Sequence, residues 1–274
     1  MAYLPISVIV MTKNNDKTLH QCLEALRPFD EVHVVDSQSQ DDTLDIAARF
    51  ENVSVTQFSW NGQYPKKKQW CLDYLTFHND WILTCDADEI VSAEFVAEIG
   101  KRVIGSQTHD GFFVKSRNVV NNRIMRFGML NTKLALFKQK MFYYPVLNDL
   151  FSGGSFEVEG HYQPLKQEKT SRIGTIDAPI LHLNTQDLMQ YKASHDRYVL
   201  WEADMTKYNL WPNDPILWRQ MIKQFLRLSV LKSFIIFVYS YLIKGGFLDG
   251  ADGWQFAKMK FDYYDAIQKR LNSL

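Results

Sequence analysis

Several features that would point to other classes of protein are scarce in this sequence of 274 residues. Its three cysteines, Cys22, Cys71 and Cys85, are too few and too widely spaced for a disulfide framework or a Cys-rich zinc site, and this usage fits a reducing cytosol. No uninterrupted apolar run approaches the roughly 20 residues that a membrane-spanning helix needs. The N-terminus lacks the basic start and cleavage site of a signal peptide. We therefore expect a cytoplasmic protein without a spanning helix.

The sequence also lacks an excess of either charge, because 31 Lys and Arg balance 31 Asp and Glu. There is no overall field to attract nucleic acid, and we expect no nucleic-acid partner. With 46% apolar residues, the chain can bury the core of one large domain, with or without an appended helical region. Function has to be sought in local patterns.

Short β-branched runs alternate with helical stretches through the first hundred residues. We expect strands and helices in turn at residues 6–11, 18–26, 31–35, 43–50, 53–57, 66–77 and 81–84. This alternation predicts an α/β fold with a doubly wound, mostly parallel sheet. Such sheets bind ligands beyond the carboxyl ends of their strands.

Beyond residue 105 the alternation stops. We expect strands at 111–116, 133–137 and 155–159, and then helices at 186–208, 215–244 and 251–271. This predicts a catalytic domain over 1–185, with a nucleotide-binding half (1–105) and an acceptor half (106–185). A helical C-terminal extension follows over 186–274.

Polar residues stand where three predicted strands end, and they are the first candidates for ligand contacts: Thr12, Lys13 and Asn14; Asp36, Ser37 and Ser39; Asp86, Asp88 and Glu89. Asp86 and Asp88 lie one residue apart, and like charges held so close resist joint ionisation unless a cation lies between them. Oxygen ligands suit Mg²⁺ or Mn²⁺, which also bind diphosphate. Alternatively, the acidic residues merely form the N-terminus of a helix that starts near Ser92.

Asp36 can accept hydrogen bonds from a nucleobase or ribose, or it can cap the next helix, a role that Asp41 or Asp42 would fill equally well. Three lysines, Lys66, Lys67 and Lys68, open the third predicted helix, where their charge opposes the helix dipole. They would bind a diphosphate or form a solvated basic turn.

Together these segments resemble the family 2 glycosyltransferases with the GT-A fold, and in particular the branch that includes lipopolysaccharide-core β-glucosyltransferases. The resemblance runs through 6–14, 31–37, Lys68-Gln69 and 81–89, and so covers much of the first hundred residues. It implies an inverting, metal-dependent transferase with nucleotide at Thr12, Asn14 and Asp36 and metal at the Asp86-Ala87-Asp88 motif. The family's pattern is broken at Asn15, where Glu is usual, and at Gln38, Gln40 and Asp42.

The resemblance is looser in the second half. It implies that Asp149 is the general base, with Glu157 and Glu159 as alternatives, because an inverting displacement needs one carboxylate near the acceptor hydroxyl. An ordinary Asn-Asp turn would also explain Asp149. His182 matches an element that would bind metal or phosphate, although a lone histidine on an apolar strand is more often a core residue. Lys192, with Arg197 and Tyr198, matches an element that would contact the diphosphate.

Residues 215–248 combine apolar and aromatic side chains with five basic residues: Arg219, Lys223, Arg227, Lys232 and Lys244. The stretch contains no acidic residue. This composition favours a helix lying in an anionic membrane surface. A core helix is the alternative. The branch acts on lipid-linked acceptors at the inner face of the membrane, and we expect peripheral attachment there.

The sequence thus predicts an inverting glycosyltransferase that moves a hexose from a nucleotide sugar, with UDP-glucose as the leading donor, to a glycan or lipid-linked acceptor of cell-envelope synthesis. Candidate donor ligands also include Lys13, Ser37, Lys68 and Lys192. A sugar-phosphate nucleotidyltransferase is the first alternative, but the loop after the first strand has no glycine. A non-catalytic membrane adaptor on the same fold is the second.

Overall fold

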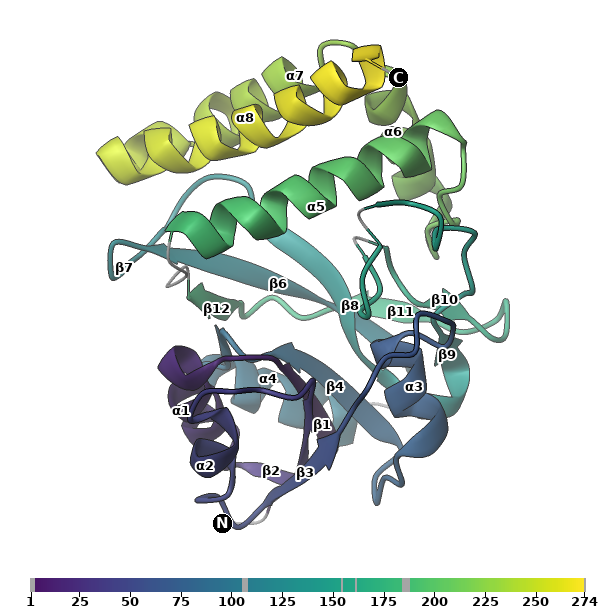
Figure 1. The fold of residues 1–274 in the computed structure, drawn as a ribbon. Coiled ribbons are helices and arrows are strands. Elements are labelled where there is room, and N and C mark those ends of the chain that lie inside the picture. The colour runs from purple at the N-terminus through teal and green to yellow at the C-terminus, as the bar shows by residue number, and fades with distance from the viewer. Residues whose placement is uncertain (1–2, 105–107, 154, 161, 184–187, 274) are drawn as a thin grey trace.

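The chain folds around one large sheet that helices cover on both faces (Figure 1). The computed structural model describes residues 3–104, 108–153, 155–160, 162–183 and 188–273. Up to residue 104 strands and helices alternate: β1 (Leu4–Thr12), α1 (Asp16–Ala25), β2 (Phe29–Asp36), α2 (Thr43–Ala47), β3 (Val53–Gln57), α3 (Lys67–Tyr74), β4 (Trp81–Asp86), β5 (Glu89–Ile90) and α4 (Ala93–Ile104). The predicted α/β class is confirmed.

The next part of the chain contributes mostly strands: β6 (Gly111–Val120), β7 (Arg123–Ile124), β8 (Asn131–Lys138), β9 (Phe142–Tyr143), β10 (Leu165–Lys166), β11 (Ile173–Thr175) and β12 (Ile180–Leu183), with a 3₁₀ turn η1 (Gln139–Met141). The strand expected at 155–159 is wrong. Its groups instead bond the first turn of α3, where Lys67 N donates to Glu157 O at 2.7 Å and Lys68 N to a Glu159 carboxylate oxygen at 2.8 Å.

The sheet brings the predicted strand ends together. Its order is β3-β2-β1-β4-β8-β6-β12-β5, with β7 and β11 paired to β6. The first four strands are parallel, and β8 continues the sheet antiparallel to both β4 and β6. Thr12 pairs in register with Asp36, and Met11 with Asp86. The polar residues after β1, β2 and β4 therefore meet at one edge.

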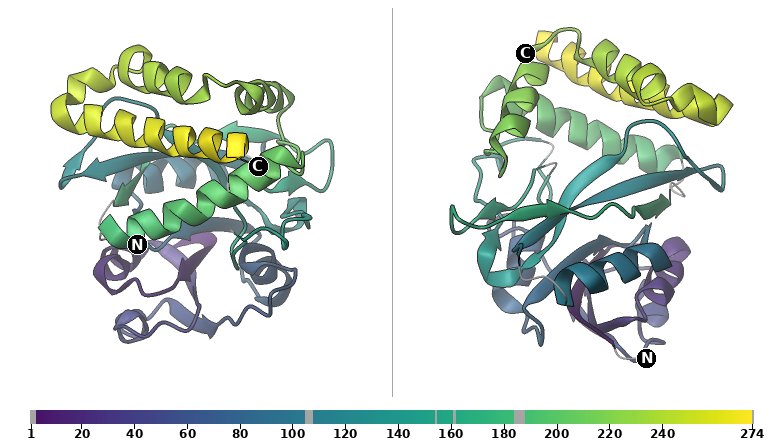
Figure 2. Two further views of the ribbon diagram at one scale, coloured as in Figure 1. Left: turned by 45° about the horizontal axis from the view of Figure 1, so that its top comes forward. Right: turned by 180° about the vertical axis from the view of Figure 1, so that it is seen from behind.

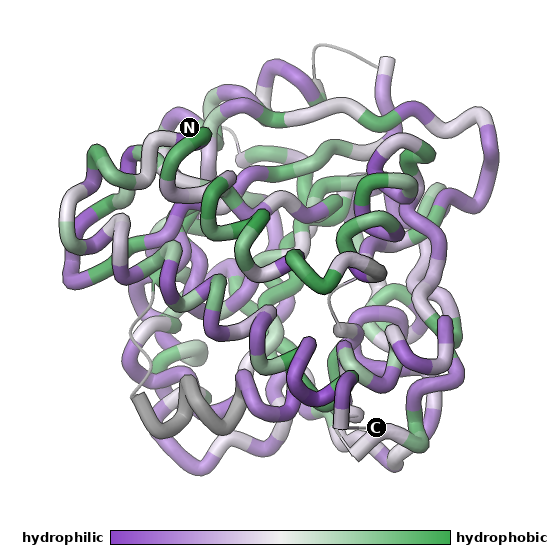
Figure 3. The backbone as a smooth tube through the Cα atoms, turned by 90° about the horizontal axis from the view of Figure 1, so that it is seen from above, coloured by the Kyte–Doolittle hydropathy of each residue, from purple (hydrophilic) through white to green (hydrophobic). Residues whose placement is uncertain are grey.

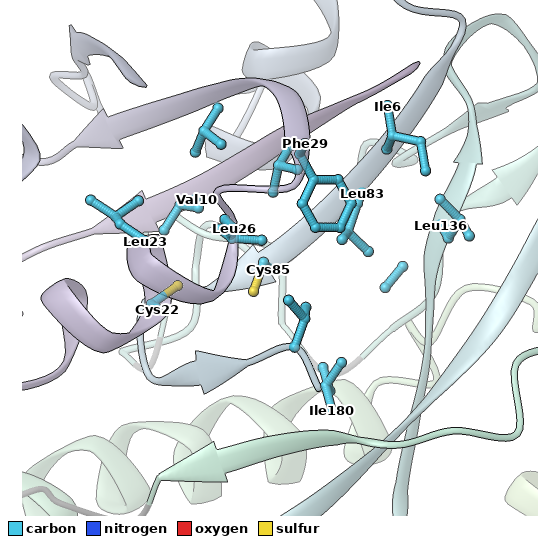
Figure 4. Close-up of a cluster of buried hydrophobic side chains, with 14 of the residues drawn as sticks. Ile6, Val10, Cys22, Leu23, Leu26, Phe29, Leu83, Cys85, Leu136 and Ile180 are labelled. Atoms are coloured by element: carbon cyan, nitrogen blue, oxygen red, sulfur yellow. The ribbon is translucent and has the colours of Figure 1, made fainter. Parts of the chain in front are cut away.

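Alternating side chains of the strands fill two cores, one on each face of the sheet. Ile6 and Val10 of β1 pack with Leu23 of α1 and with Phe29 and Leu83 (Figure 4). On the opposite face, Ile9 of β1 belongs to a cluster that includes residues of α3 and α5 (Leu188–Lys207). The strands that carry the strand-end residues are therefore packed on both faces.

A helical layer lies over one face of the sheet (Figures 1 and 2). It contains α5, α6 (Leu217–Leu228), α7 (Lys232–Val238), a π-helical turn η2 (Tyr239–Ile243), a 3₁₀ turn η3 (Gly246–Asp249) and α8 (Gly250–Ser273). Helix α8 packs against both α5 and α7. The single helix expected at 215–244 is wrong, because the chain leaves the helix at Ser229, whose hydroxyl accepts the Leu231 N–H at 3.3 Å.

No single helix in the described ranges has both the length and the apolar composition to cross a membrane. One bent pair, Lys232–Ile243 with Gly246–Ser273, passes the same test together across a 67° bend.

Candidate functional site

Asp36 is the last residue of β2, and both of its carboxylate oxygens already accept hydrogen bonds from the protein. One carboxylate oxygen accepts Thr12 Oγ1 at 2.9 Å and Ser39 Oγ at 2.5 Å, and the other accepts Ser39 N at 2.9 Å and Gln57 Nε2 at 3.2 Å. Desolvation raises the pKa of Asp36, but the hydrogen bonds from Ser39, Thr12 and Gln57 outweigh it and hold the pKa below its ordinary value. A nucleobase contact would have to replace one of these donors, and Gln57 is the most distant.

The loops after β1 and β2 are locked to each other through Asn14. Its backbone N–H donates to Ser39 Oγ at 2.8 Å, and its side-chain oxygen accepts Gln40 N at 2.8 Å. Asn14 takes a left-handed backbone, with φ of 55°, which asparagine tolerates better than most residues. Asp36 does not cap α2, because Asp41 accepts the Thr43 N–H at 3.1 Å. Lys13 remains mostly exposed, 3.9 Å from Glu157.

The lysines that open α3 are not a solvated basic turn, because Lys66 and Lys67 are fully buried. Lys67 Nζ donates to Thr12 O at 3.0 Å and to Ser37 Oγ at 2.6 Å, which ties α3 to the first two strand ends. Burial lowers the pKa of Lys67 to about 8. Lys68 Nζ lies 5.6 Å from the centre of the Tyr144 ring, and its charge acts on Asp86.

Asp86 shares a cation with Glu89 that the sequence did not reveal. Lys133 of β8 donates to Asp86 Oδ2 at 2.8 Å and to Glu89 Oε2 at 2.6 Å, and Glu89 is 2% exposed. Desolvation raises the pKa of Asp86, but Lys133 and Lys68 more than offset this and hold the pKa well below its ordinary value. The acidic residues 86–89 do not form the N-terminus of α4. Ser92 caps this helix instead, because its Oγ accepts the Phe95 N–H at 3.1 Å.

Asp88 faces His182 of β12, with 3.5 Å between Asp88 Oδ2 and His182 Nε2. Desolvation raises the pKa of Asp88, and Asp86 adds to this, while His182 opposes it. The phenol of Tyr198 also lies close enough for both aspartates to raise its pKa, after the larger effect of desolvation.

These side chains fit a divalent cation that shares its coordination with a ligand. Neighbouring ligands of an octahedral divalent cation lie about 3 Å apart, close to the 3.5 Å between Asp88 Oδ2 and His182 Nε2. Within the described ranges no group of three or more His, Cys, Asp or Glu side chains could hold a metal ion by itself. Mg²⁺ usually takes one or two protein ligands and completes its shell with phosphate oxygens and water. The metal at Asp86 and Asp88, with His182 as a further ligand, therefore stays a prediction.

The three candidate bases differ in access. Asp149 is fully buried: its Oδ1 accepts Tyr64 OH at 2.8 Å, and its Oδ2 accepts Lys66 Nζ and Trp201 Nε1, each at 2.7 Å. Both of its oxygens are thus shielded from solvent and already accept hydrogen bonds from the protein. Glu159 is buried at the start of α3, and burial raises its pKa. Glu157 is the accessible one, with 20% of its side chain exposed.

The remaining predicted contact, Lys192, lies in α5, but its side chain is outside the part of the chain that the structure describes. Among the other donor-site candidates, Thr12 bonds Asp36 directly, and Lys67 connects Thr12 with Ser37. Lys68 lies close enough to Asp86 to lower its pKa. Lys133 was missed because its role depends on strand pairing between β4 and β8.

Comparison with known proteins gives a family and a fold. The family model described as "Glycosyl transferase family 2" matches residues 7–168, more than half of the chain. An uncharacterized glycosyltransferase of Rickettsia bellii is 25% identical over 255 residues, covering 89% of this chain and 80% of the relative. The SPbeta prophage-derived glycosyltransferase SunS of Bacillus subtilis is 31% identical over 94 residues, 34% of this chain. The chain spans less than half the length of SunS and of a Rickettsia typhi relative, at 22% and 47%.

Among solved structures, the mannosyltransferase PcManGT of Pyrobaculum calidifontis, in complex with GDP-Man and Mn²⁺, has a TM-score of 0.53 at 14% identity. The match covers 99% of this chain and 88% of PcManGT. At this level of identity the likeness is one of fold.

Proposed function

The chain belongs to glycosyl transferase family 2 and has the GT-A fold, and from this premise we propose that it is a metal-dependent, inverting hexosyltransferase. The donor is a nucleoside diphosphate sugar, with UDP-glucose as the leading candidate. The acceptor is a hydroxyl of a glycan or lipid-linked molecule in cell-envelope polysaccharide or lipopolysaccharide synthesis, as in the branch that the sequence resembles. The observation that carries the proposal is the Asp88–His182 pair beside the parallel strand ends.

Asp88 and His182 would hold Mg²⁺ or Mn²⁺, which would bind the diphosphate oxygens and offset the charge of the leaving nucleotide. PcManGT, solved with Mn²⁺ and a nucleotide sugar, is a precedent on the same fold. Lys133 keeps Asp86 ionised and turned toward β8, which leaves Asp88 as the principal ligand and Asp86 for the ribose or metal. Thr12, Asn14 and Asp36 with Ser37 and Lys67 form the frame for the nucleoside.

The proposed base is Asp149, with the more accessible Glu157 and the buried Glu159 as alternatives. For Asp149 to act, acceptor binding would have to displace Tyr64 or Trp201 from its oxygens. Catalytic hydrogen bonds often reach their productive geometry only when substrate binds, so the burial of Asp149 in this structure does not exclude it as the base. Asp149→Asn, Glu157→Gln and Glu159→Gln decide between the three, with single-turnover rates measured beside nucleotide affinity. Every variant should bind the donor normally, and only the variant that lacks the base should fail in transfer.

The location that we propose is the cytoplasm, at the inner face of the cytoplasmic membrane, where a lipid-linked acceptor would be presented. Residues 215–248 would provide the attachment. Support comes from the large apolar side chains that this segment exposes, among them Leu217 and Phe225.

The test is a thermal-stabilisation panel of UDP, GDP and their sugars, with and without Mn²⁺. We expect UDP to stabilise the protein only when the metal is present. Asp88→Asn and His182→Gln should each abolish the metal-dependent part, while Asp262→Asn, in an exposed ion pair of α8, should leave it intact. Stabilisation by GDP instead would change the donor. No stabilisation by any nucleotide would contradict the transferase proposal.

A further inference from the structure

Helix α6 exposes its apolar side chains. Leu217, Trp218, Met221, Ile222 and Phe225 are each more than half exposed, up to 76% for Leu217. The chain that follows, from 230 to 248, continues this surface with six more side chains that are more than half exposed: Val230, Leu231, Phe234, Leu242, Ile243 and Leu248. Hydrophobic segments are visible in the helical layer when the molecule is seen from above (Figure 3). We call the exposed side chains of 217–248 the apolar face.

The charged side chains of α6 point the other way, into the protein. Arg219 and Lys223 pair with Asp214 at 3.3 and 2.6 Å, and Asp214 is 1% exposed. The guanidinium of Arg227 lies 3.9 Å from the centre of the Trp211 ring. A surface helix of a water-soluble protein normally packs its apolar stripe inward and solvates its charges, and α6 does the reverse. The expectation that its basic residues face an anionic surface is therefore wrong for these three.

The exposed charged residues of the segment 217–250 and of the hairpin beside it are basic. The hairpin residues 121–128 adjoin it, because Phe127 N donates to Asp249 Oδ2 at 2.8 Å and Gly128 N to Lys244 O at 2.9 Å. Across 121–130 and 217–250, the exposed charged residues that the structure describes are Arg123, Arg126 and Lys244. They belong to the apolar segment itself or to the hairpin that contacts it, and we call these three residues the basic rim.

We infer that the apolar face inserts into the anionic leaflet of a lipid bilayer, with Arg123, Arg126 and Lys244 at the lipid phosphates. Interfacial helices bury their apolar side to a depth of about 5–10 Å and gain from nearby basic residues, a combination that this surface provides. A second copy of the chain is a poorer fit, because the described exposed residues of the face and hairpin include no acidic side chain to pair with the rim. The inference deepens the proposed location and does not depend on the transfer reaction.

Flotation of the full chain with phosphatidylcholine vesicles, with or without phosphatidylglycerol, tests the inference. We expect binding to both, tighter to the anionic vesicles. Met221→Glu with Phe225→Glu should weaken both at least about tenfold, since two charges would enter the apolar layer. Tyr74→Glu, at an equally exposed aromatic on α3, is the matched control and should bind as the wild type does. Arg123→Gln with Arg126→Gln should remove only the preference for anionic lipid.

Each variant is checked by thermal unfolding and by nucleotide stabilisation, so that loss of the fold or of the donor site is separated from loss of lipid binding. The inference is overturned if wild-type protein ignores both vesicles, or if the double glutamate variant floats as well as the wild type. Self-association in light scattering that Met221→Glu with Phe225→Glu abolishes, without any vesicle binding, would identify a second copy as the occupant. Nucleotide stabilisation is unaffected by these outcomes and reports separately on the proposed transferase.

Discussion

The edge of the sheet where β1, β2 and β4 end, which we call the donor edge after its proposed role, and the α6 region both hold cations in specific pairs. The two regions nevertheless expose different surfaces, one polar and one apolar. At the donor edge, Lys66, Lys67 and Lys133 lie beneath or beside carboxylates and carbonyls, and polar groups such as Asp86 and Asn14 remain open to a ligand. In the helical layer, Arg219 and Lys223 are turned onto Asp214, and the open surface is apolar.

The difference shows that buried ion pairs do separate work in the two regions. At the strand ends they hold polar loops in one geometry, as the proposed donor site requires. In α6 they anchor a helix from behind, which allows its other side to remain apolar. A charged residue in the sequence therefore indicates a ligand in one region and an anchor in the other.

We expect the largest effect on stability from the buried Lys66–Asp149 pair. Both side chains are fully buried at 2.7 Å, so Lys66→Met leaves a carboxylate without its cation. We expect the free energy of unfolding to fall by about 3–5 kcal/mol in urea denaturation. The double variant Lys66→Met with Asp149→Leu should recover only part of the loss, because Tyr64 OH and Trp201 Nε1 also lose their acceptor. Unchanged stability of the single variant would mean that the pair contributes nothing.

The anchor of α6 is expected to be weaker. Asp214→Asn removes the charge that Arg219 and Lys223 share, but these partners are 18% and 31% exposed and stay partly hydrated. We expect a loss of about 2 kcal/mol in the free energy of unfolding. Asp262→Asn, which breaks an exposed pair with Lys258, should change it by less than about 0.5 kcal/mol. Equal effects of the two variants would remove the distinction between anchor and surface pair.

The pH dependence of stability tests the burial of Lys67 at the donor edge. Burial lowers the pKa of Lys67 from its ordinary value of 10.5 to about 8, so in the window between these values the unfolded chain binds more protons than the folded one. The contribution of Lys67 to stability is thus fully present above 10.5 and is lost as the pH falls through 8. We expect it to raise the free energy of unfolding by roughly 1 kcal/mol from pH 7 to pH 9. Lys67→Met should flatten this rise, and an unchanged slope would contradict the assignment.

The donor edge could be predicted from the sequence because its signals are local. Each of Asp36 and Asp86 ends a short apolar strand, and parallel pairing then puts such ends at one edge. Lys133 and the Lys66–Asp149 pair could not be predicted, because they join segments far apart in the chain whose relative placement depends on strand order and loop packing. The same long-range packing buries Asp149, which the resemblance alone would place at an acceptor.

The orientation of α6 shows a further limit. The spacing of Arg219, Lys223 and Arg227 marks one side of a helix, and the apolar residues mark the other. Periodicity therefore identifies two faces, but only tertiary contacts with Asp214 and Trp211 decide which one is inside.

The smallest expected effect concerns the apolar face itself. Phe225 is 68% exposed, so Phe225→Ala removes little packing and should change the free energy of unfolding by no more than about 0.5 kcal/mol without lipid. Phe256→Ala is the matched control: its ring is 4% exposed within the same layer, and its removal should cost about 3–5 kcal/mol. Anionic vesicles should raise the melting temperature of the wild type more than that of Phe225→Ala, because ligands that bind only the folded state stabilise it. A large loss for Phe225→Ala in the absence of lipid would mean that this side of α6 is packed in solution, and the contrast between the two regions would disappear.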